Sequence, residues 1–372
     1  MKRLEERRQS GTIDSINSLH VDLMIEILTK LPPGSVSKLI CVSKLWSSII
    51  QGKHFSDLYL TRSSTRPLLL GLLYLPATRL YQYSFSQENP SSDHSVSPKM
   101  IPGYPISPPV HGLICSIDVD ADVFVANPTM GQFLTLPRIN SLHSSLFGYD
   151  PVNDLYKVFS MTRVTDKHGH LVSVDHYVFT LGAQKTWRMI ECKCPHYPVT
   201  LGGICKDGVV YYLARSKSYS PHNGSYVVVS LDIRSEEFSL MTLPDCVRIE
   251  PFDEFSLVSY NGKIALVNHS RNGKFDLWVL MDVIKQEWTK ISVLVRCWKD
   301  LVGNRVYCRG TISTGELLFE PCNFHDKLFI IYYNPKEDKA RRVYFEKSGD
   351  GCIRCRMFVD HIESLMFLPW KV

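Results

Sequence analysis

Ile16–Ile50 reads INSLHVDLMIEILTKLPPGSVSKLICVSKLWSSII, and this stretch near the N-terminus decides the fold. Large apolar residues recur every fourth position in its first half, which predicts a helix that is apolar over a wide arc. They are Leu19, Leu23, Ile27 and Leu31, with Met24 and Leu28 beside them. Pro32 and Pro33 end this helix, because proline has no amide hydrogen and its ring disrupts a helical turn.

Two more short helices follow. Ser35 is placed to cap a second helix that carries Val36, Leu39 and Ile40. A third is predicted from helical spacing of Val42, Leu45, Trp46, Ile49 and Ile50. Three short helices are too few to bury so many large apolar side chains, so the surplus apolar surface predicts a binding partner.

The same stretch resembles an F-box. The resemblance rests on Leu19-x-x-Asp22-Leu23-x-x-Glu26-Ile27-Leu28-x-x-Leu31-Pro32 and on Val42-Ser43-Lys44-x-Trp46-x-x-Ile49. It departs from the family where His20 replaces the usual proline, where Gly34 replaces a basic residue, and where Leu39-Ile40 replaces an Arg-Phe pair. None of these departures removes an apolar anchor.

The resemblance implies docking on the Skp-type adaptor of SCF ubiquitin ligases. The residues expected to bind the adaptor are Leu19, Leu23, Ile27, Leu28, Leu31, Pro32, Leu39, Val42, Trp46 and Ile49. Some of them must pack the helices together, and Leu31 and Trp46 are expected to dominate binding because large apolar anchors carry most interface energy. The alternative is an ordinary helical hairpin buried in its own domain, although the next segment offers no obvious helical partner.

Length and composition are those of an ordinary globular protein with one small and one large domain. The chain has 372 residues, 44% hydrophobic, 21% charged, with a net charge of +5 and scattered basic residues, so neither nucleic acid nor a membrane is an expected partner. There is no signal-peptide pattern, and the eleven cysteines are expected to be reduced. We expect a flexible segment 1–12, an F-box domain 13–60 and a β domain 66–372, in the cytoplasm, the nucleus or both, and not secreted.

From Pro67 onward, short apolar runs rich in aromatic and β-branched residues alternate with polar turns, which predicts strands and almost no helix. The turns are centred near Ala77, Asn127, Gly182, Asp232, Asp282 and Asn334, at spacings of 50, 55, 50, 50 and 52 residues. A period near 50 with about four strands per unit is typical of a β-propeller. We therefore predict an α+β multidomain chain: three short helices, then a six-bladed β-propeller closed by pairing of the domain's N- and C-terminal strands. The alternative is a set of irregular β-sandwiches.

This region resembles the F-box-associated domain of a large plant family over about residues 66 to 370. The motifs are Phe147-Gly148-Tyr149-Asp150-Pro151, Asn127-Pro128-Thr129, Trp187-Arg188, Gly208–Ala214, Leu277–Leu280, Glu287-Trp288 and Asp360–Leu365. In that family the domain is thought to select the protein to be ubiquitinated, and the resemblance implies the same role here.

No pattern for chemistry stands out, so no catalytic residue, cofactor or metal is expected. Cys192-Lys193-Cys194 and Cys352-Ile353-Arg354-Cys355 each lack a second zinc-binding pair, so we interpret them as strand cysteines. His168, His170 and His176 are interpreted as solvated turn residues, and Asp118, Asp120 and Asp122 as solvated turn charges. Four tryptophans are expected to pack between blades: Trp187, Trp278, Trp288 and Trp298.

The leading hypothesis is a non-catalytic substrate receptor of an SCF-type ubiquitin ligase. The helices would bind the adaptor and, through it, the cullin and ring subunits, while the β domain would bind an unknown protein substrate through loops such as 86–109, 215–224 and 296–310. One alternative is a propeller enzyme or ligand-binding domain that the F-box only tethers. Another is an F-box protein that acts outside a ligase.

Overall fold

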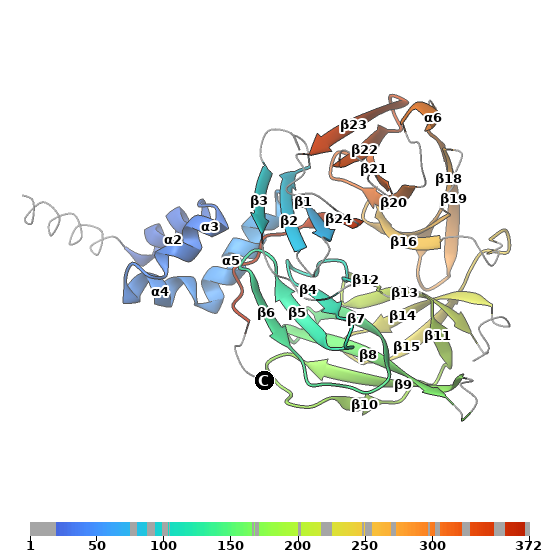
Figure 1. The fold of residues 1–372 in the computed structure, drawn as a ribbon, viewed down its shortest axis with the longest axis horizontal. Coiled ribbons are helices and arrows are strands. Elements are labelled where there is room, and N and C mark those ends of the chain that lie inside the picture. Colours follow the sequence, from blue (N-terminus) through green and yellow to red (C-terminus); the bar gives the residue numbers. More distant parts are fainter. Residues whose placement is uncertain are drawn as a thin grey trace, which may run out of the picture.

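The computed structural model places a small group of helices beside a large all-β domain (Figure 1). It describes residues 20–368, apart from 75–79, 88–93, 99–102, 104, 166, 168–170, 200–201, 217–224, 248, 250–254, 269–272, 297, 302–305, 322–327 and 346–353. The predicted turn at Ala77, most of the loop 215–224 and parts of the loops 86–109 and 296–310 therefore lie outside the described residues.

The first three described helices are α2 (Val21–Thr29), α3 (Pro33–Leu39) and α4 (Lys44–Ile50). His20 caps α2, because its Nδ1 accepts from the Asp22 amide at 3.4 Å. The expected cap at Ser35 is wrong. Helix α3 begins one turn earlier at Pro33, since proline already has the φ angle of a first helical residue and needs no amide donor there.

A fourth helix, α5 (Lys53–Ser64), corrects the prediction of three. Its sequence KHFSDLYLTRSS is mostly polar, so its apolar periodicity is weak. Phe55 and Tyr59, one turn apart, are its two buried side chains, and the Tyr59 hydroxyl donates to the Leu31 carbonyl at 3.1 Å. The stretch Ile16–Ile50 therefore does have a helical partner within the chain, and α5 covers part of its apolar surface.

The β domain contains five sheets among the described residues. The first sheet, in the order β24-β1-β2-β3, contains β24 (Arg354–His361), β1 (Leu68–Tyr74), β2 (Leu80–Ser86) and β3 (His94–Pro98). The second contains β4 (Ile114–Ile117), β5 (Val123–Asn127) and β6 (Gln132–Thr135). The third, in the order β10-β9-β8-β7, contains β7 (Leu142–Asp150), β8 (Leu155–Thr165), β9 (Leu171–Thr180) and β10 (Arg188–Ile190).

The remaining strands form two further sheets. The fourth sheet, in the order β11-β13-β14-β15 with β12 also paired to β13, contains β11 (His196–Pro198), β12 (Ile204–Lys206), β13 (Val209–Ser216), β14 (Tyr226–Asp232) and β15 (Phe238–Thr242). The fifth runs β19-β18-β17-β16-β20-β21-β22-β23. Its strands are β16 (Phe255–Tyr260), β17 (Lys263–Asn268), β18 (Lys274–Asp282), β19 (Glu287–Leu294), β20 (Val306–Thr311), β21 (Leu317–Pro321), β22 (Leu328–Asn334) and β23 (Lys339–Phe345). A short helix α6 (Trp298–Leu301) lies between β19 and β20.

The two ends of the β domain meet in one sheet. Strand β24 pairs antiparallel with β1, with Gly71 opposite Met357, so the last strand of the domain completes the sheet that the first three begin (Figure 1). This pairing leaves fewer open strand edges than two unpaired ends would. The chain thus consists of a small helical part followed by a large all-β domain whose first and last strands pair.

The eight-stranded sheet is joined at its middle by a single parallel residue pair, Ser259 with Gly310. Gly310 has φ +106°, and a β-carbon there would collide with the Ser259 carbonyl oxygen. Only glycine tolerates both conditions. On either side of this joint lies a group of four antiparallel strands.

Polar residues cap the hairpin turns as the sequence predicts. Asp282 Oδ1 accepts from the amides of Ile284 and Lys285, both at 2.9 Å, and Asp232 Oδ1 accepts from the Ser235 amide at 2.7 Å. The Asp side chain thus accepts hydrogen bonds from turn amides that would otherwise bond only to water. These hydrogen bonds explain why Asp and Asn recur at this position of the repeat.

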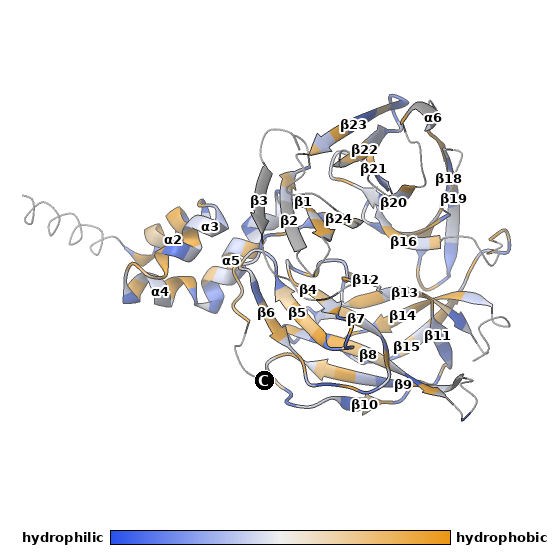
Figure 2. Ribbon diagram, viewed as in Figure 1, coloured by the Kyte–Doolittle hydropathy of each residue, from blue (hydrophilic) through white to orange (hydrophobic). Residues whose placement is uncertain are grey.

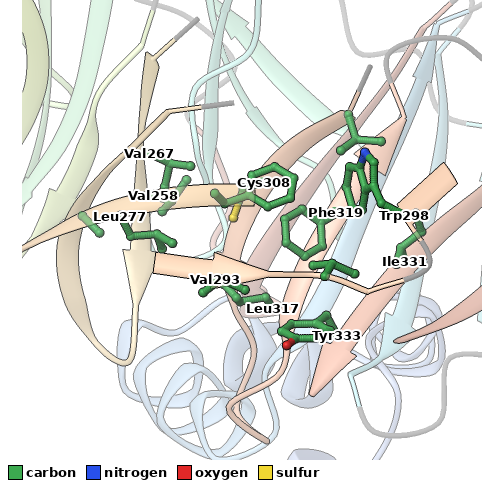
Figure 3. Close-up of a cluster of buried hydrophobic side chains, with 14 of the residues drawn as sticks. Val258, Val267, Leu277, Val293, Trp298, Cys308, Leu317, Phe319, Ile331 and Tyr333 are labelled. Carbon is green, nitrogen blue, oxygen red and sulfur yellow. The ribbon is translucent and has the colours of Figure 1, made fainter. Parts of the chain in front are cut away.

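The core of the β domain lies between neighbouring groups of strands. In the cluster of Figure 3, the rings of Phe275 and Phe319 lie 4.6 Å apart between centroids, and Trp298 packs edge-on against both. The expected packing role of the tryptophans is confirmed: Trp278 and Trp298 are buried, and Trp187 and Trp288 lie against apolar clusters. Each large side chain buried in this way contributes about 1.5–3 kcal/mol.

Candidate functional site

An exposed apolar face lies on the helices, at the end of the molecule away from most of the β sheets. Leu23 and Ile27, one turn apart on α2, are 51% and 49% exposed, and Val21 on the same helix is 43% exposed. Val42, in the turn before α4, is 63% exposed, and Leu45 follows at 37%. Figure 2 shows hydrophobic and hydrophilic residues alternating along these helices. We call Leu23, Ile27, Val42 and Leu45 the helical apolar face; Val21 lies about 200° around α2 from Leu23 and does not belong to it.

The structure divides the ten residues that the sequence assigned to adaptor binding. Exposed residues are Leu23, Ile27, Pro32 and Val42. Half-buried residues, packed against the core of the helices, are Leu31, Leu39, Trp46 and Ile49. Leu28 is completely buried, and Leu19 lies outside the described residues.

One residue of the helical apolar face, Leu45, was not singled out from the sequence as a binding residue. Leu45 belongs to the apolar pattern of the stretch, so the sequence indicated its residue type but not its exposure. The exposure of a residue depends on where α5 and the rest of the chain pack. The apolar pattern of α2 and α4 carries no information about that packing.

Charged pairs flank the apolar face. Lys30 Nζ donates to Glu26 Oε1 at 2.7 Å, one turn apart on α2, and this hydrogen bond lowers the pKa of the Glu26 carboxyl. Both side chains are more than half exposed, so water screens the pair and it adds little to stability. The pair instead gives the apolar face a polar border, which is the usual anatomy of a protein–protein interface.

The helices pack onto the β domain through its C-terminal segment, residues 362–368. Leu365 is completely buried in the helical core together with Leu28, Val36 and Phe55. The Glu363 amide donates to Ser63 Oγ at 3.1 Å, so the segment also bonds to the end of α5. Figure 1 shows this segment passing beside α5 after β24.

The same segment is bonded on its other side to the β5–β6 turn. Asn127 Nδ2 donates to the carbonyls of Ser364 at 3.0 Å and Met366 at 2.8 Å. Gly112 lies against it with φ +81°, and a β-carbon there would collide with the Ile362 carbonyl oxygen. The C-terminal segment therefore lies between the two parts of the molecule and bonds to both.

A charged contact adds to this junction. Lys53 at the start of α5 pairs with Asp154 in the β7–β8 turn at 2.5 Å, and the Tyr149 hydroxyl donates to the same carboxylate at 2.7 Å. The hydrogen bond from Lys53 is the main reason that the pKa of Asp154 lies below its ordinary value.

A cavity of about 600 Å³ lies where strands of several sheets converge in the β domain. Residues from β12, β16, β20 and β24 line it, together with residues 108–112. Arg309 in its wall binds Glu320 through two hydrogen bonds of 2.8 and 2.9 Å, and Glu320 also accepts from the Met357 amide at 2.7 Å. Both members of this ion pair are nearly inaccessible, so the pair holds β20, β21 and β24 together.

Some polar residues singled out in the sequence are where we expected them. Asp118 Oδ1 accepts from the amides of Asp120 and Asp122, both at 2.9 Å, and Asp122 pairs with Arg138 at 2.8 Å. Asp118, Asp120 and Asp122 are therefore turn charges, as predicted.

The expectation for the histidines and cysteines of the third and fourth sheets is wrong in two places. His176 is 4% exposed rather than solvated, since it faces the space between β9 and β11. Cys192 and Cys194 lie in the loop between β10 and β11, not on strands. His168, His170 and Cys352 lie outside the described residues.

Comparison with protein families assigns both parts of the chain. Residues 16–57 match the F-box domain, and residues 74–366 match the F-box associated beta propeller domain. In the part of the chain that the structure describes, no helix has both the length and the apolar character needed to cross a membrane.

Full-length relatives come from Arabidopsis thaliana. An F-box/kelch-repeat protein is 42% identical over 99% of this chain and 97% of its own length. The F-box protein DOR is 31% identical over 96% of each chain. Among solved structures, the SapL1 lectin aligns with 78% of this chain and 98% of its own, at 10% identity and a TM-score of 0.41. A periplasmic gluconolactonase of Pseudomonas aeruginosa aligns with 79% of this chain and 99% of its own, at 9% identity and a TM-score of 0.40.

Proposed function

The chain belongs to the F-box proteins that carry an F-box associated beta propeller domain, and we propose that it is the substrate receptor of an SCF-type ubiquitin ligase. The helices dock on a Skp-type adaptor, which connects the chain to cullin and ring subunits. The β domain holds the protein to be ubiquitinated. Such a receptor works by proximity, because tethering raises the effective concentration of the target near the ubiquitin-charged enzyme.

The observation that carries this proposal is the helical apolar face. Leu23 and Ile27 on α2 are large, apolar and exposed, although the helix lies beside a core that could have covered them. We assign adaptor contact to Leu23, Ile27 and Val42, supported by Leu45. Leu28 holds the helices together, and Leu31, Leu39, Trp46 and Ile49 do so in part.

We also propose that the β domain has six blades. The single residue pair at Ser259 and Gly310 divides the eight-stranded sheet into two groups of four, and each group resembles one blade. With four more sheets, this division gives six units. The domain limits 13–60 and 66–372 stay as proposals, with the C-terminal segment contacting both parts. We place the protein in the cytoplasm, the nucleus or both, where the adaptor is expected.

The test is binding of the purified full chain to a purified Skp-type adaptor, measured by calorimetry. The variant Leu23→Asp with Ile27→Asp should fold normally, because both side chains are half exposed. It should bind roughly 1,000-fold more weakly, since two apolar anchors contribute about 2 kcal/mol each. Unchanged affinity in this variant would refute the docking surface.

A matched control carries the same change at apolar residues far from the helices. Val119→Asp with Ile284→Asp alters two side chains in turns of the β domain that are 97% and 94% exposed. This control should keep full affinity. An equal loss of affinity in both double variants would assign the effect to the added negative charge rather than to the helical apolar face.

A second candidate is a propeller that binds a small ligand, and the cavity of about 600 Å³ is the observation that favours it. Its size lies within the usual range for small-molecule sites. A thermal-shift screen of the full chain with sugars, nucleotides and metals tests it, because a ligand that binds the folded state raises the melting temperature. Stabilisation that Arg356→Ala abolishes would place the ligand in the cavity.

A further inference from the structure

Three side chains of metal-ligand type converge where the third sheet meets the fourth. They are His176 on β9, Cys192 in the loop after β10, and His196 on β11. One potential ligand atom from each lies within 4.8 Å of the others. Because the three residues come from separate segments, folding alone brings them together.

The two histidines of the cluster are buried, and one of their nitrogen atoms has no hydrogen-bond partner among the described residues. His176 is 4% exposed and His196 is 2% exposed, while Cys192 is half-buried. Among the described residues, nothing hydrogen-bonds to Nε2 of His176. A buried polar atom without a hydrogen-bond partner is unusual, because the missing hydrogen bond costs about 1–3 kcal/mol.

The other histidine has a neighbour suited to hold it as a ligand. His196 Nε2 contacts the Tyr212 hydroxyl, and His196 Nδ1 lies 3.7 Å from Cys192 Sγ and 2.8 Å from the Cys194 carbonyl. The Cys194 carbonyl accepts from His196 Nδ1 and, at 3.3 Å, from Cys192 Sγ, so a metal on these two atoms would replace both hydrogens. The imidazole hydrogen would then sit on Nε2, which would donate it to Tyr212. Histidine ligands commonly have this arrangement, in which the second nitrogen is held by an oxygen.

We propose that His176, Cys192 and His196 form a zinc site that links the third and fourth sheets. Tetrahedral zinc with Zn–N near 2.0–2.1 Å and Zn–S near 2.3 Å requires ligand atoms about 3.4–3.8 Å apart. Cys192 Sγ and His196 Nδ1 already have this spacing, at 3.7 Å. His176 completes the set by a shift of about 1 Å or less.

Zinc fits better than other divalent ions because of the ligand types. Two imidazoles and one thiolate suit zinc, whereas magnesium and calcium take oxygen ligands. Metal binding at this set would require the Cys192 thiol to lose its proton, so zinc uptake should release protons. The fourth position falls to water or to Cys194, whose thiol donates to the Phe238 carbonyl at 3.3 Å.

The site would be a structural metal site rather than a catalytic one. His176 belongs to the sheet β10-β9-β8-β7 and His196 to the sheet that begins with β11, so one ion would tie two sheets that share no strand. The rings of the two histidines lie 5.3 Å apart between centroids, and the Phe238 ring lies 5.0 and 5.5 Å from them.

The experiment measures zinc in the full-length chain purified without chelator, and then the spectrum after exchange with Co²⁺. We expect one zinc per chain and a thiolate-to-cobalt charge-transfer band. Cys192→Ser and His176→Asn should each lose stoichiometric zinc and the band. Tyr212→Phe should keep the site but weaken zinc affinity about 10- to 100-fold, as expected of a residue that positions a ligand.

Two further measurements keep the outcome decisive. Cys205→Ser alters another half-buried thiol, on β12, and should retain both zinc and the band. Zinc should raise the melting temperature of the intact chain but not of Cys192→Ser, whose fold is checked by circular dichroism. A folded intact chain without bound zinc, or a cobalt band that survives Cys192→Ser, overturns the proposal.

Discussion

The helical part and the β domain bury their apolar side chains in different ways. The helices leave Leu23 and Ile27 half exposed on α2, and their core is completed by Leu365 from the far end of the chain. The β domain fills the space between its strand groups with its own residues, such as Phe275 and Phe319, and closes by pairing β24 with β1. A small domain with surplus apolar surface is suited to docking, and a closed sheet arrangement is suited to holding its shape.

This difference also shows how the two parts depend on each other. The helices rely on the C-terminal segment for a core residue, whereas each large cluster of the β domain consists of β-domain residues. We therefore expect damage to the β domain to reach the helices through that segment, and damage to the helices to stay local.

The largest expected effect follows from Glu320→Ala in the β domain. This change removes one member of a nearly inaccessible ion pair, leaves Arg309 charged without its partner, and frees the Met357 amide. The free energy of unfolding should fall by about 3–5 kcal/mol, measured by urea denaturation. Glu337→Ala, at an exposed pair with Lys339, should change it by less than about 1 kcal/mol. A small loss for Glu320→Ala would show that this pair does not hold the strands.

The next prediction tests whether the helices unfold independently of the β domain. Leu365→Ala leaves a hole in the helical core and should cost about 2–5 kcal/mol of helical stability. Amide hydrogen exchange should then speed up in α5 while β18 stays protected. Equal acceleration in both elements would mean that the two parts unfold as one unit, contrary to the comparison.

A smaller effect concerns acid stability at the contact between the third and fourth sheets. Burial alone would raise the pKa of Glu236, but hydrogen bonds from Lys157 at 2.8 Å and Arg188 at 2.6 Å outweigh it and lower that pKa. A carboxyl with a lowered folded pKa stabilises above its unfolded value, near 4.5, and this stability is lost as pH falls through the folded pKa.

Glu236→Gln should therefore lower the free energy of unfolding by about 1.5–3 kcal/mol at pH 7 and reduce its dependence on pH below 4.5. Denaturation curves between pH 3 and 7 measure both quantities. A variant with the same pH dependence as the intact chain would assign acid sensitivity to other carboxyls.

The sequence was sufficient for the family and for the general architecture. Period-four spacing predicted α2, and the family resemblance of both parts is confirmed by the F-box and F-box associated domain matches. Recurring turns with Asp or Asn predicted the hairpins around Asp232 and Asp282. These features depend on local spacing and local hydrogen bonds, so a sequence contains them directly.

Helix α5 was missed because only Phe55 and Tyr59 face the core, and two apolar residues on a polar helix give little periodic signal. The burial of His176 was missed because it depends on β11 and β15, which lie tens of residues away in the chain. The division of the adaptor-binding candidates into exposed and packed residues has the same cause.

The sequence by itself thus determined the first three helices, the repeated strands after them and the apolar character of the docking stretch, because periodicity and turn chemistry are local. Only the tertiary structure decided that Leu365 completes the helical core, that Leu28 is buried while Ile27 is exposed, and that His176, Cys192 and His196 meet. These outcomes depend on contacts between residues far apart in the chain, and a local pattern does not record which distant surface will cover it.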